Sequence, residues 1–138
     1  MKIVYALTLV VLLTSCSNRS KDLEGTWTLE NIDYSEYFKD APDDVRDIIG
    51  DRMATELERI KGKTFFVFGR NGELELKAPN YEGREVSEKG TWELNKSKDS
   101  ISFDISIDET YAIVELSETE LILKTSETPA RTITLSRK

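Results

Sequence analysis

The sequence predicts a mainly β protein, built from antiparallel strands around one hydrophobic core. From Leu23 onward, apolar residues recur mostly at every second position. Turn residues interrupt this pattern about every eight to twelve positions, as in an all-β barrel or sandwich. The chain has 138 residues, a length that suits one domain with a single core.

Eight segments follow the two-residue period, and the polar turns between them are short enough to make neighbouring strands antiparallel. In 73–78 and 101–107 apolar and polar residues alternate strictly, so one face should be dry and the other wet. Asn71 and Gly72 both tolerate positive φ, which favours a tight hairpin between two of the segments. The predicted strands are residues 26–33, 64–68, 73–78, 85–94, 101–107, 111–116, 121–125 and 131–136.

Between the first two predicted strands, the apolar spacing changes to three and four, which is typical of the buried face of a helix. We expect one amphipathic helix over about 42–61, with an acidic face toward solvent. Pro42 suits its first turn and Gly62 its end. Gly50 weakens its middle by about 1 kcal/mol relative to alanine, so a break there is an alternative. The expected buried face consists of Val45, Ile48, Ile49, Met53, Leu57 and Ile60.

The N-terminal residues have the pattern of a targeting segment. Lys2 precedes an apolar run over 3–13, which has the length of a signal-peptide core and is too short to cross a bilayer. The run ends at Leu13-Thr14-Ser15-Cys16, which resembles a bacterial lipobox and contains the only cysteine of the chain. The resemblance implies cleavage before Cys16 and attachment of acyl chains to its thiol. An ordinary secretory signal with an incidental cysteine is the alternative.

A short motif occurs twice: Gly25-Thr26-Trp27-Thr28-Leu29 and Gly90-Thr91-Trp92-Glu93-Leu94. In each copy the glycine permits a bend or a close backbone approach, and the tryptophan and leucine point to the same side. These two motifs, the helix, the Phe68-x-x-Asn71-Gly72 hairpin and the final meander together resemble the lipocalin-like lipoproteins of Gram-negative bacteria.

The resemblance to lipocalin-like lipoproteins covers about 23–135. It implies an eight-stranded antiparallel up-and-down barrel with one amphipathic helix between strands 1 and 2. The sequence departs from the family because the helix follows the first strand, the chain is shorter than a typical lipocalin, and the later lipocalin motifs are not matched. Either Arg131 or Arg137 is a candidate to cover the barrel floor beside Trp27.

Together these features divide the chain into three parts. We expect a lipoprotein signal peptide (1–15), a lipid-anchored tether (16–22) and a lipocalin-like barrel domain (23–138). The expected location is the cell envelope, with the acyl chains on Cys16 as the contact with the membrane. Ser17 stands where some bacteria place an inner-membrane retention aspartate, so the resemblance implies the outer membrane and leaves a periplasmic or surface face open.

The composition excludes several functions. The chain has no histidine and one cysteine, which rules out Ser-His-Asp triads and Cys/His zinc sites. Its net charge of −7 argues against a nucleic-acid partner. The aspartates of 40–51 follow helical spacing and not that of a calcium loop. We therefore expect no catalytic residue, metal or cofactor; a hydrolase with two convergent carboxylates is an alternative reading.

An eight-stranded barrel is just wide enough either to be filled by its own side chains or to hold one small ligand. We expect non-covalent binding of a small apolar or amphipathic molecule. The alternative is a filled barrel that acts as an interaction module for another envelope protein. A continuous apolar cavity of about 300 Å³ or more would favour the ligand. The candidate ligand-binding residues are Trp27, Phe66, Phe68, Leu74, Leu76, Trp92, Phe103 and Ile105.

Overall fold

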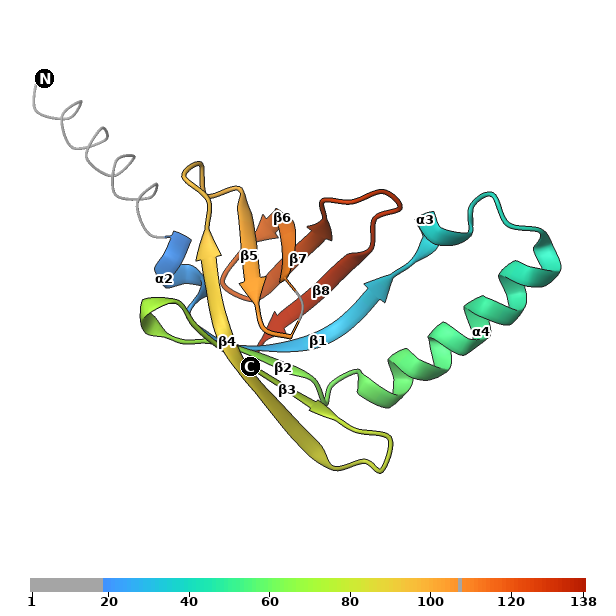
Figure 1. The fold of residues 1–138 in the computed structure, drawn as a ribbon, viewed down its shortest axis with the longest axis horizontal. Helices are drawn as coiled ribbons and strands as arrows, with labels where there is room; N and C mark the ends of the chain where they lie inside the picture. Colours follow the sequence, from blue (N-terminus) through green and yellow to red (C-terminus); the bar gives the residue numbers. More distant parts are fainter. Residues whose placement is uncertain (1–18, 107) are drawn as a thin grey trace, which may run out of the picture.

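The computed structural model describes residues 19–106 and 108–138, and in this part of the chain eight strands close into one antiparallel barrel (Figure 1). Each strand pairs with its neighbour in sequence, and the first pairs with the last. The predicted eight-stranded up-and-down barrel is therefore confirmed, and a sandwich is excluded. The strands are β1 (Gly25–Asp33), β2 (Phe65–Phe68), β3 (Glu73–Pro79), β4 (Glu85–Leu94), β5 (Ser100–Asp104), β6 (Asp108–Leu116), β7 (Glu120–Thr125) and β8 (Thr132–Arg137), with a 3-10 turn η1 (Arg70–Gly72) before β3.

The strand boundaries differ most from prediction at the β5–β6 hairpin. Strand β5 ends at Asp104, although alternation predicts a strand to residue 107, and β6 begins at Asp108, three residues early. The register pairs Asp104 with Asp108, and Ile105 and Ser106 lie in the turn that follows β5. Ile107 lies outside the described residues, as do Cys16 and the predicted signal peptide.

Two carboxylates face each other at this hairpin, on the exposed side of the sheet. The hydrogen bond and the negative charge of Asp108 raise the pKa of the Asp104 carboxyl above its ordinary value of 3.8. The folded chain thus holds this proton more tightly than the unfolded chain. The free energy of unfolding therefore falls as the pH rises from 3.8, the ordinary pKa, through the raised pKa of the folded chain.

We expect Asp104→Asn to raise the melting temperature at about pH 7 and to reduce the difference between melts at about pH 4 and about pH 7. The substitution removes the negative charge that opposes ionised Asp108. Thermal melts followed by circular dichroism at both pH values check this. An unchanged or lower melting temperature of Asp104→Asn at neutral pH would show that the two charges do not destabilise the hairpin.

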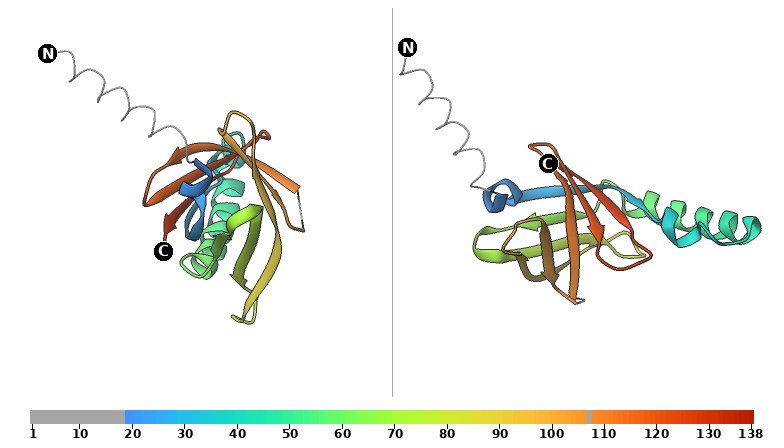
Figure 2. Two further views of the ribbon diagram at one scale, coloured as in Figure 1. Left: turned by 90° about the vertical axis from the view of Figure 1, so that its left-hand side faces the viewer. Right: turned by 90° about the horizontal axis from the view of Figure 1, so that it is seen from above.

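Two helices lie between β1 and β2: the single turn α3 (Ser35–Phe38) and the long helix α4 (Asp43–Ile60). Helix α4 matches the predicted helix to within one residue at each end and continues through Gly50 without a break. The predicted burial of its apolar face is wrong, because none of its residues is buried and Ile48 is 58% exposed. Strand β1 and α3 carry the chain past the end of the barrel, so the first turns of α4 project beyond the strands (Figures 1 and 2).

The closed end of the barrel lies where the described chain begins. Helix α2 (Arg19–Leu23) overlaps the predicted tether (16–22) and places Leu23, the first residue of the predicted barrel domain, in the core. Trp27 is fully buried, and its indole N–H donates to the Leu23 carbonyl oxygen at 2.9 Å. The Arg137 guanidinium lies 4.2 Å from the centroid of the Trp27 ring and donates to two backbone carbonyl oxygens of the segment around α2. Arg137, and not Arg131, therefore covers the floor.

The half of the barrel next to this floor is a packed core. Phe66 pairs with Leu76 and Phe68 with Leu74, which confirms the predicted inward phase of both strands. The ring of Phe68 packs edge-on against that of Trp92, with centroids 5.6 Å apart. Every strand pair and the core lie within residues 19–138, so this segment contains a complete folding unit.

Candidate functional site

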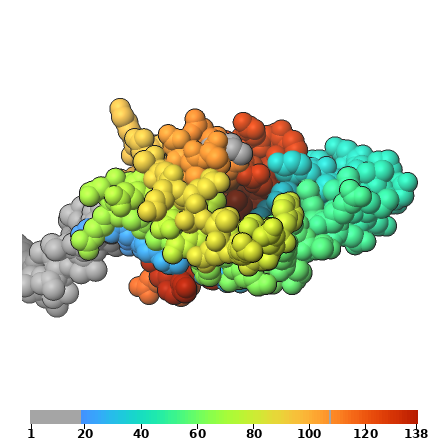
Figure 3. Space-filling model, turned by 60° about the horizontal axis from the view of Figure 1, so that its bottom comes forward, coloured from blue at the N-terminus to red at the C-terminus, as the bar shows by residue number. Residues whose placement is uncertain are grey.

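The open end of the barrel holds a cavity of about 320 Å³. Its lining residues Ile32 and Ile133 place it near the end of β1 and the start of β8. In the space-filling view, a hollow opens between the β3–β4 hairpin and the segment of α3 and α4, with the last strand at its bottom (Figure 3). Apolar side chains from β1, β2, β3, β8 and the β5 region form its walls: Ile32, Phe66, Leu76, Phe103, Ile105 and Ile133.

The eight residues predicted from alternation divide into two groups. Four of them line the cavity: Phe66, Leu76, Phe103 and Ile105. The other four lie deeper, in the packed core: Trp27, Phe68, Leu74 and Trp92. Alternation gives the face of the sheet on which a side chain lies but not its depth along the barrel axis. Contact of any of these residues with a ligand stays a prediction.

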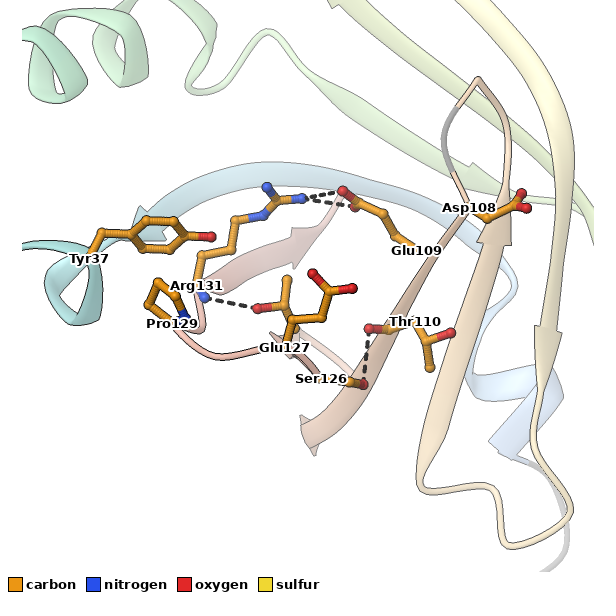
Figure 4. Close-up of a pocket in the computed structure, with 9 residues that line it drawn as sticks. Tyr37, Asp108, Glu109, Thr110, Ser126, Glu127, Pro129 and Arg131 are labelled. Carbon is orange, nitrogen blue, oxygen red and sulfur yellow. Dashed lines mark hydrogen bonds and ion pairs between the residues drawn. The ribbon is translucent and has the colours of Figure 1, made fainter.

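The cavity also contains an ion pair that the alternation pattern did not single out. Arg131 Nη2 donates to both carboxylate oxygens of Glu109, at 2.7 and 2.8 Å (Figure 4). It also donates to the hydroxyl oxygen of Tyr111 at 3.0 Å. The tyrosine hydroxyl in turn donates to Glu109. The side chains of Arg131 and Glu109 are 27% and 31% exposed, so both are partly withdrawn from water. The inward phase of Tyr111 and Ile113 on β6 is the sequence signal that places Glu109 on the inner face.

Hydrogen bonds fix the backbone that carries the arginine. The Arg131 N–H donates to Thr125 Oγ1 at 3.0 Å, and the Ala130 N–H donates to a carboxylate oxygen of Glu36 at 2.8 Å. Glu36 also pairs with Lys124 at 3.3 Å. The hydrogen bond from the Ala130 N–H is the main cause of a lowered pKa of the Glu36 carboxyl, and Lys124 lowers this pKa further. Helix α3 is thus joined to the β7–β8 hairpin, and together they form one side of the mouth.

Helix α4 is joined to the opposite side of the mouth by one arginine. Arg59 Nη1 donates to the carbonyl oxygens of Pro79 and Asn80, at 2.9 and 3.0 Å, and the guanidinium lies 4.6 Å from the centroid of the Tyr81 ring. Glu56 accepts two hydrogen bonds from the same guanidinium, and they lower the pKa of its carboxyl. The last turns of α4 therefore hold the β3–β4 hairpin in position.

A second, polar pocket of about 300 Å³ adjoins the mouth and shares Arg131 and Glu109 with the cavity (Figure 4). Its other lining residues come from α3, β6 and the β7–β8 hairpin: Tyr37, Asp108, Thr110, Thr125, Ser126, Glu127 and Pro129. Tyr34, which lines the apolar cavity, has a pKa raised mainly by burial, so its hydroxyl stays protonated. The site therefore combines an apolar interior with a polar, hydrogen-bonding mouth.

Within residues 19–106 and 108–138, no group of three or more His, Cys, Asp or Glu side chains is placed to hold a metal ion. Among the helices of the same residues, none has the length and apolar character needed to span a membrane.

The apolar cavity with its polar mouth is suited to non-covalent binding of a molecule with an apolar body and a polar head.

Comparison with known families is consistent with this barrel. The chain matches the model of the lipocalin-like domain over residues 23–123, which is most of its length. It belongs to the lipocalin-like family. The lipocalin-like resemblance predicted from the Gly-x-Trp motifs is thereby confirmed. No curated protein is a significant match to this lipocalin-like chain.

Solved structures share the fold at low sequence identity. A lipocalin-like protein from Bacteroides uniformis aligns with a TM-score of 0.56 and 17% identity, covering 85% of this chain and 98% of that one. An uncharacterized protein from Bacteroides eggerthii aligns with a TM-score of 0.54 and 13% identity, over 83% and 98% of the two chains. As-p18, an extracellular fatty acid binding protein, has a TM-score of 0.46 and 12% identity, over 86% and 97%. The two Bacteroides structures show a shared fold and nothing beyond it.

Proposed function

We propose that this protein is a lipid-anchored lipocalin-like protein of the cell envelope that binds a small apolar or amphipathic molecule in the cavity of its barrel. The cavity is the observation that carries the proposal, because it has apolar walls, one open end and a few polar groups at its mouth. Its volume of about 320 Å³ is within the range of small-molecule sites. The proposed binding involves no catalytic step and no cofactor.

Membrane attachment is the second part of the proposal. It is supported by the lipobox resemblance of Leu13-Thr14-Ser15-Cys16, which lies outside the described residues. Several acyl chains on Cys16 would hold the protein firmly, since each buried methylene contributes about 0.8 kcal/mol. The outer membrane is the proposed location, because Ser17 follows the cysteine.

A cavity-filling substitution tests the binding site. Leu76 lines the cavity, and the larger side chain in Leu76→Trp should occupy space that a ligand needs. We expect Leu76→Trp to weaken the binding of a neutral apolar fluorescent dye to residues 17–138 by at least about tenfold, or about 1.4 kcal/mol. Val114→Trp is the matched control, because Val114 is 58% exposed and lies on the same barrel outside the cavity.

The proposal requires both variants to melt cooperatively and only Leu76→Trp to lose the dye. Equal binding by the two variants would place the dye outside the cavity and contradict the proposed site. If the wild-type protein takes up no dye and carries no co-purified molecule in native mass spectrometry, the filled-barrel interaction module becomes the better description.

A further inference from the structure

The charges that face the cavity indicate which head group it accepts. Three charged side chains line it: Glu88, Glu109 and Arg131. Glu88 lies opposite Leu76 in the β3–β4 register, and Glu109 lies opposite Phe103 in the β5–β6 register. Both residues therefore lie on the inner face of the barrel, next to residues of the apolar wall that an alkyl chain would contact.

Arg131 is already neutralised by the protein. One of its nitrogens donates to both oxygens of Glu109 and to Tyr111. An incoming carboxylate at this guanidinium would lie beside the Glu109 carboxylate, in a partly buried place where repulsion is weakly screened by water. Arg131, the only cation among the described residues that line the cavity, is thus a poor receptor for an anionic head group.

Glu88 differs from Arg131 in its ion pairing. None of the ion pairs among residues 19–106 and 108–138 includes Glu88, an exposed residue that lines the cavity at its mouth. The pocket next to the mouth adds Asp108 and Glu127 and no further cation. The entrance is therefore negatively charged, which attracts cations and repels anions as they approach.

We propose that the cavity binds a cationic amphiphile, an alkyl chain with an ammonium head group, in preference to an alkyl carboxylate. The chain occupies the space between Phe66, Leu76 and Phe103, and the ammonium pairs with Glu88 at the mouth. Glu109 contributes by keeping Arg131 occupied. This inference rests on the proposed function, because it concerns the ligand of the same cavity.

The test is a matched series of decylamine, decanol and decanoate, each below the concentration at which it forms micelles. At neutral pH the amine is a cation and the acid an anion, so the three differ chiefly in head-group charge. Their displacement of the neutral dye from residues 17–138 gives the three affinities. We expect decylamine to bind at least about tenfold more tightly than decanoate, with decanol between them.

Two single substitutions separate the roles of the carboxylates. Glu88→Gln should weaken the binding of decylamine by about tenfold, since the cation loses its partner. The binding of decanol should stay unchanged. Glu109→Gln should free the Arg131 guanidinium from its carboxylate partner and strengthen the binding of decanoate. Glu93→Gln is the control, because Glu93 is exposed and follows the inward-facing Trp92 on the same strand as Glu88. It should change none of the three affinities.

The outcomes distinguish this inference from the proposed function. Decanoate binding as tightly as decylamine would overturn the inference, while displacement by decanol would still support a ligand-binding cavity. Decylamine binding that survives Leu76→Trp would be binding to the acidic surface and would also overturn it. Failure of all three compounds and of the dye to bind would overturn the proposed function itself, and the inference with it.

Discussion

Replacing Trp27 with alanine should lower the free energy of unfolding by about 3–5 kcal/mol, the largest single effect we expect. The indole is fully buried at the closed end and donates a hydrogen bond to the Leu23 carbonyl oxygen. Its removal leaves a cavity beneath α2 and takes the aromatic face from Arg137. Since domains of this size have about 5–15 kcal/mol of stability, much of the total would be lost.

Urea denaturation followed by circular dichroism measures this loss. Trp27→Phe keeps most of the buried ring and should lose much less than Trp27→Ala. Val114→Ala is a surface control, because Val114 is 58% exposed. A loss below about 1 kcal/mol for Trp27→Ala would mean that the closed end repacks and that the Trp27 stack is not what holds it.

Gly90→Ala should be the second most damaging change. A Cβ atom on Gly90 would press into the backbone carbonyl group of Asp104 and stand 3.1 Å from the Ile105 Cα. The neighbours are backbone atoms of β5 and of the residue after it, so no side-chain rotation relieves the contact. We expect a loss of about 3 kcal/mol in free energy of unfolding, at the upper end of ordinary overpacking.

The helix provides a matched glycine with the opposite expected sign. Nothing lies within 4 Å of a Cβ atom on Gly50, in the middle of α4. Gly50→Ala should therefore raise the free energy of unfolding by about 0.5–1 kcal/mol. Both variants are measured in the same urea series. If Gly90→Ala is as stable as the wild type, the close approach of β4 and β5 is absent in solution.

The strands could be predicted because their signal is local. In 73–78, for example, apolar and polar residues alternate because one face of the sheet is buried and the other faces water. The register of β2 with β3 follows from the Asn71-Gly72 turn that joins them. The end of β5 could not be predicted, because Asp104 and Asp108 are set opposite each other by pairing with β6, and not by the pattern of β5.

The packing of α4 and the depth of the site required the structure. The spacing of Val45, Ile48 and Ile49 indicates an apolar helix face, but the path of β1 and α3 decides whether that face meets the barrel. In the same way, the sequence identifies Phe68 and Phe103 as inward-facing without showing that only Phe103 reaches the cavity. Arg131 and Glu109 come from β8 and β6 regions 22 residues apart, and only the closed barrel brings them together.

The position of α2 has a consequence for how a ligand would be delivered. The chain enters the barrel at its closed end, and only Ser17 and Asn18 separate Cys16 from the first residue of α2. An acylated Cys16, as proposed above, would therefore place the floor of the barrel, and not its mouth, nearest the bilayer. The mouth would open away from the lipid, so cargo would be exchanged through water or with a carrier, instead of sliding in from the anchoring leaflet.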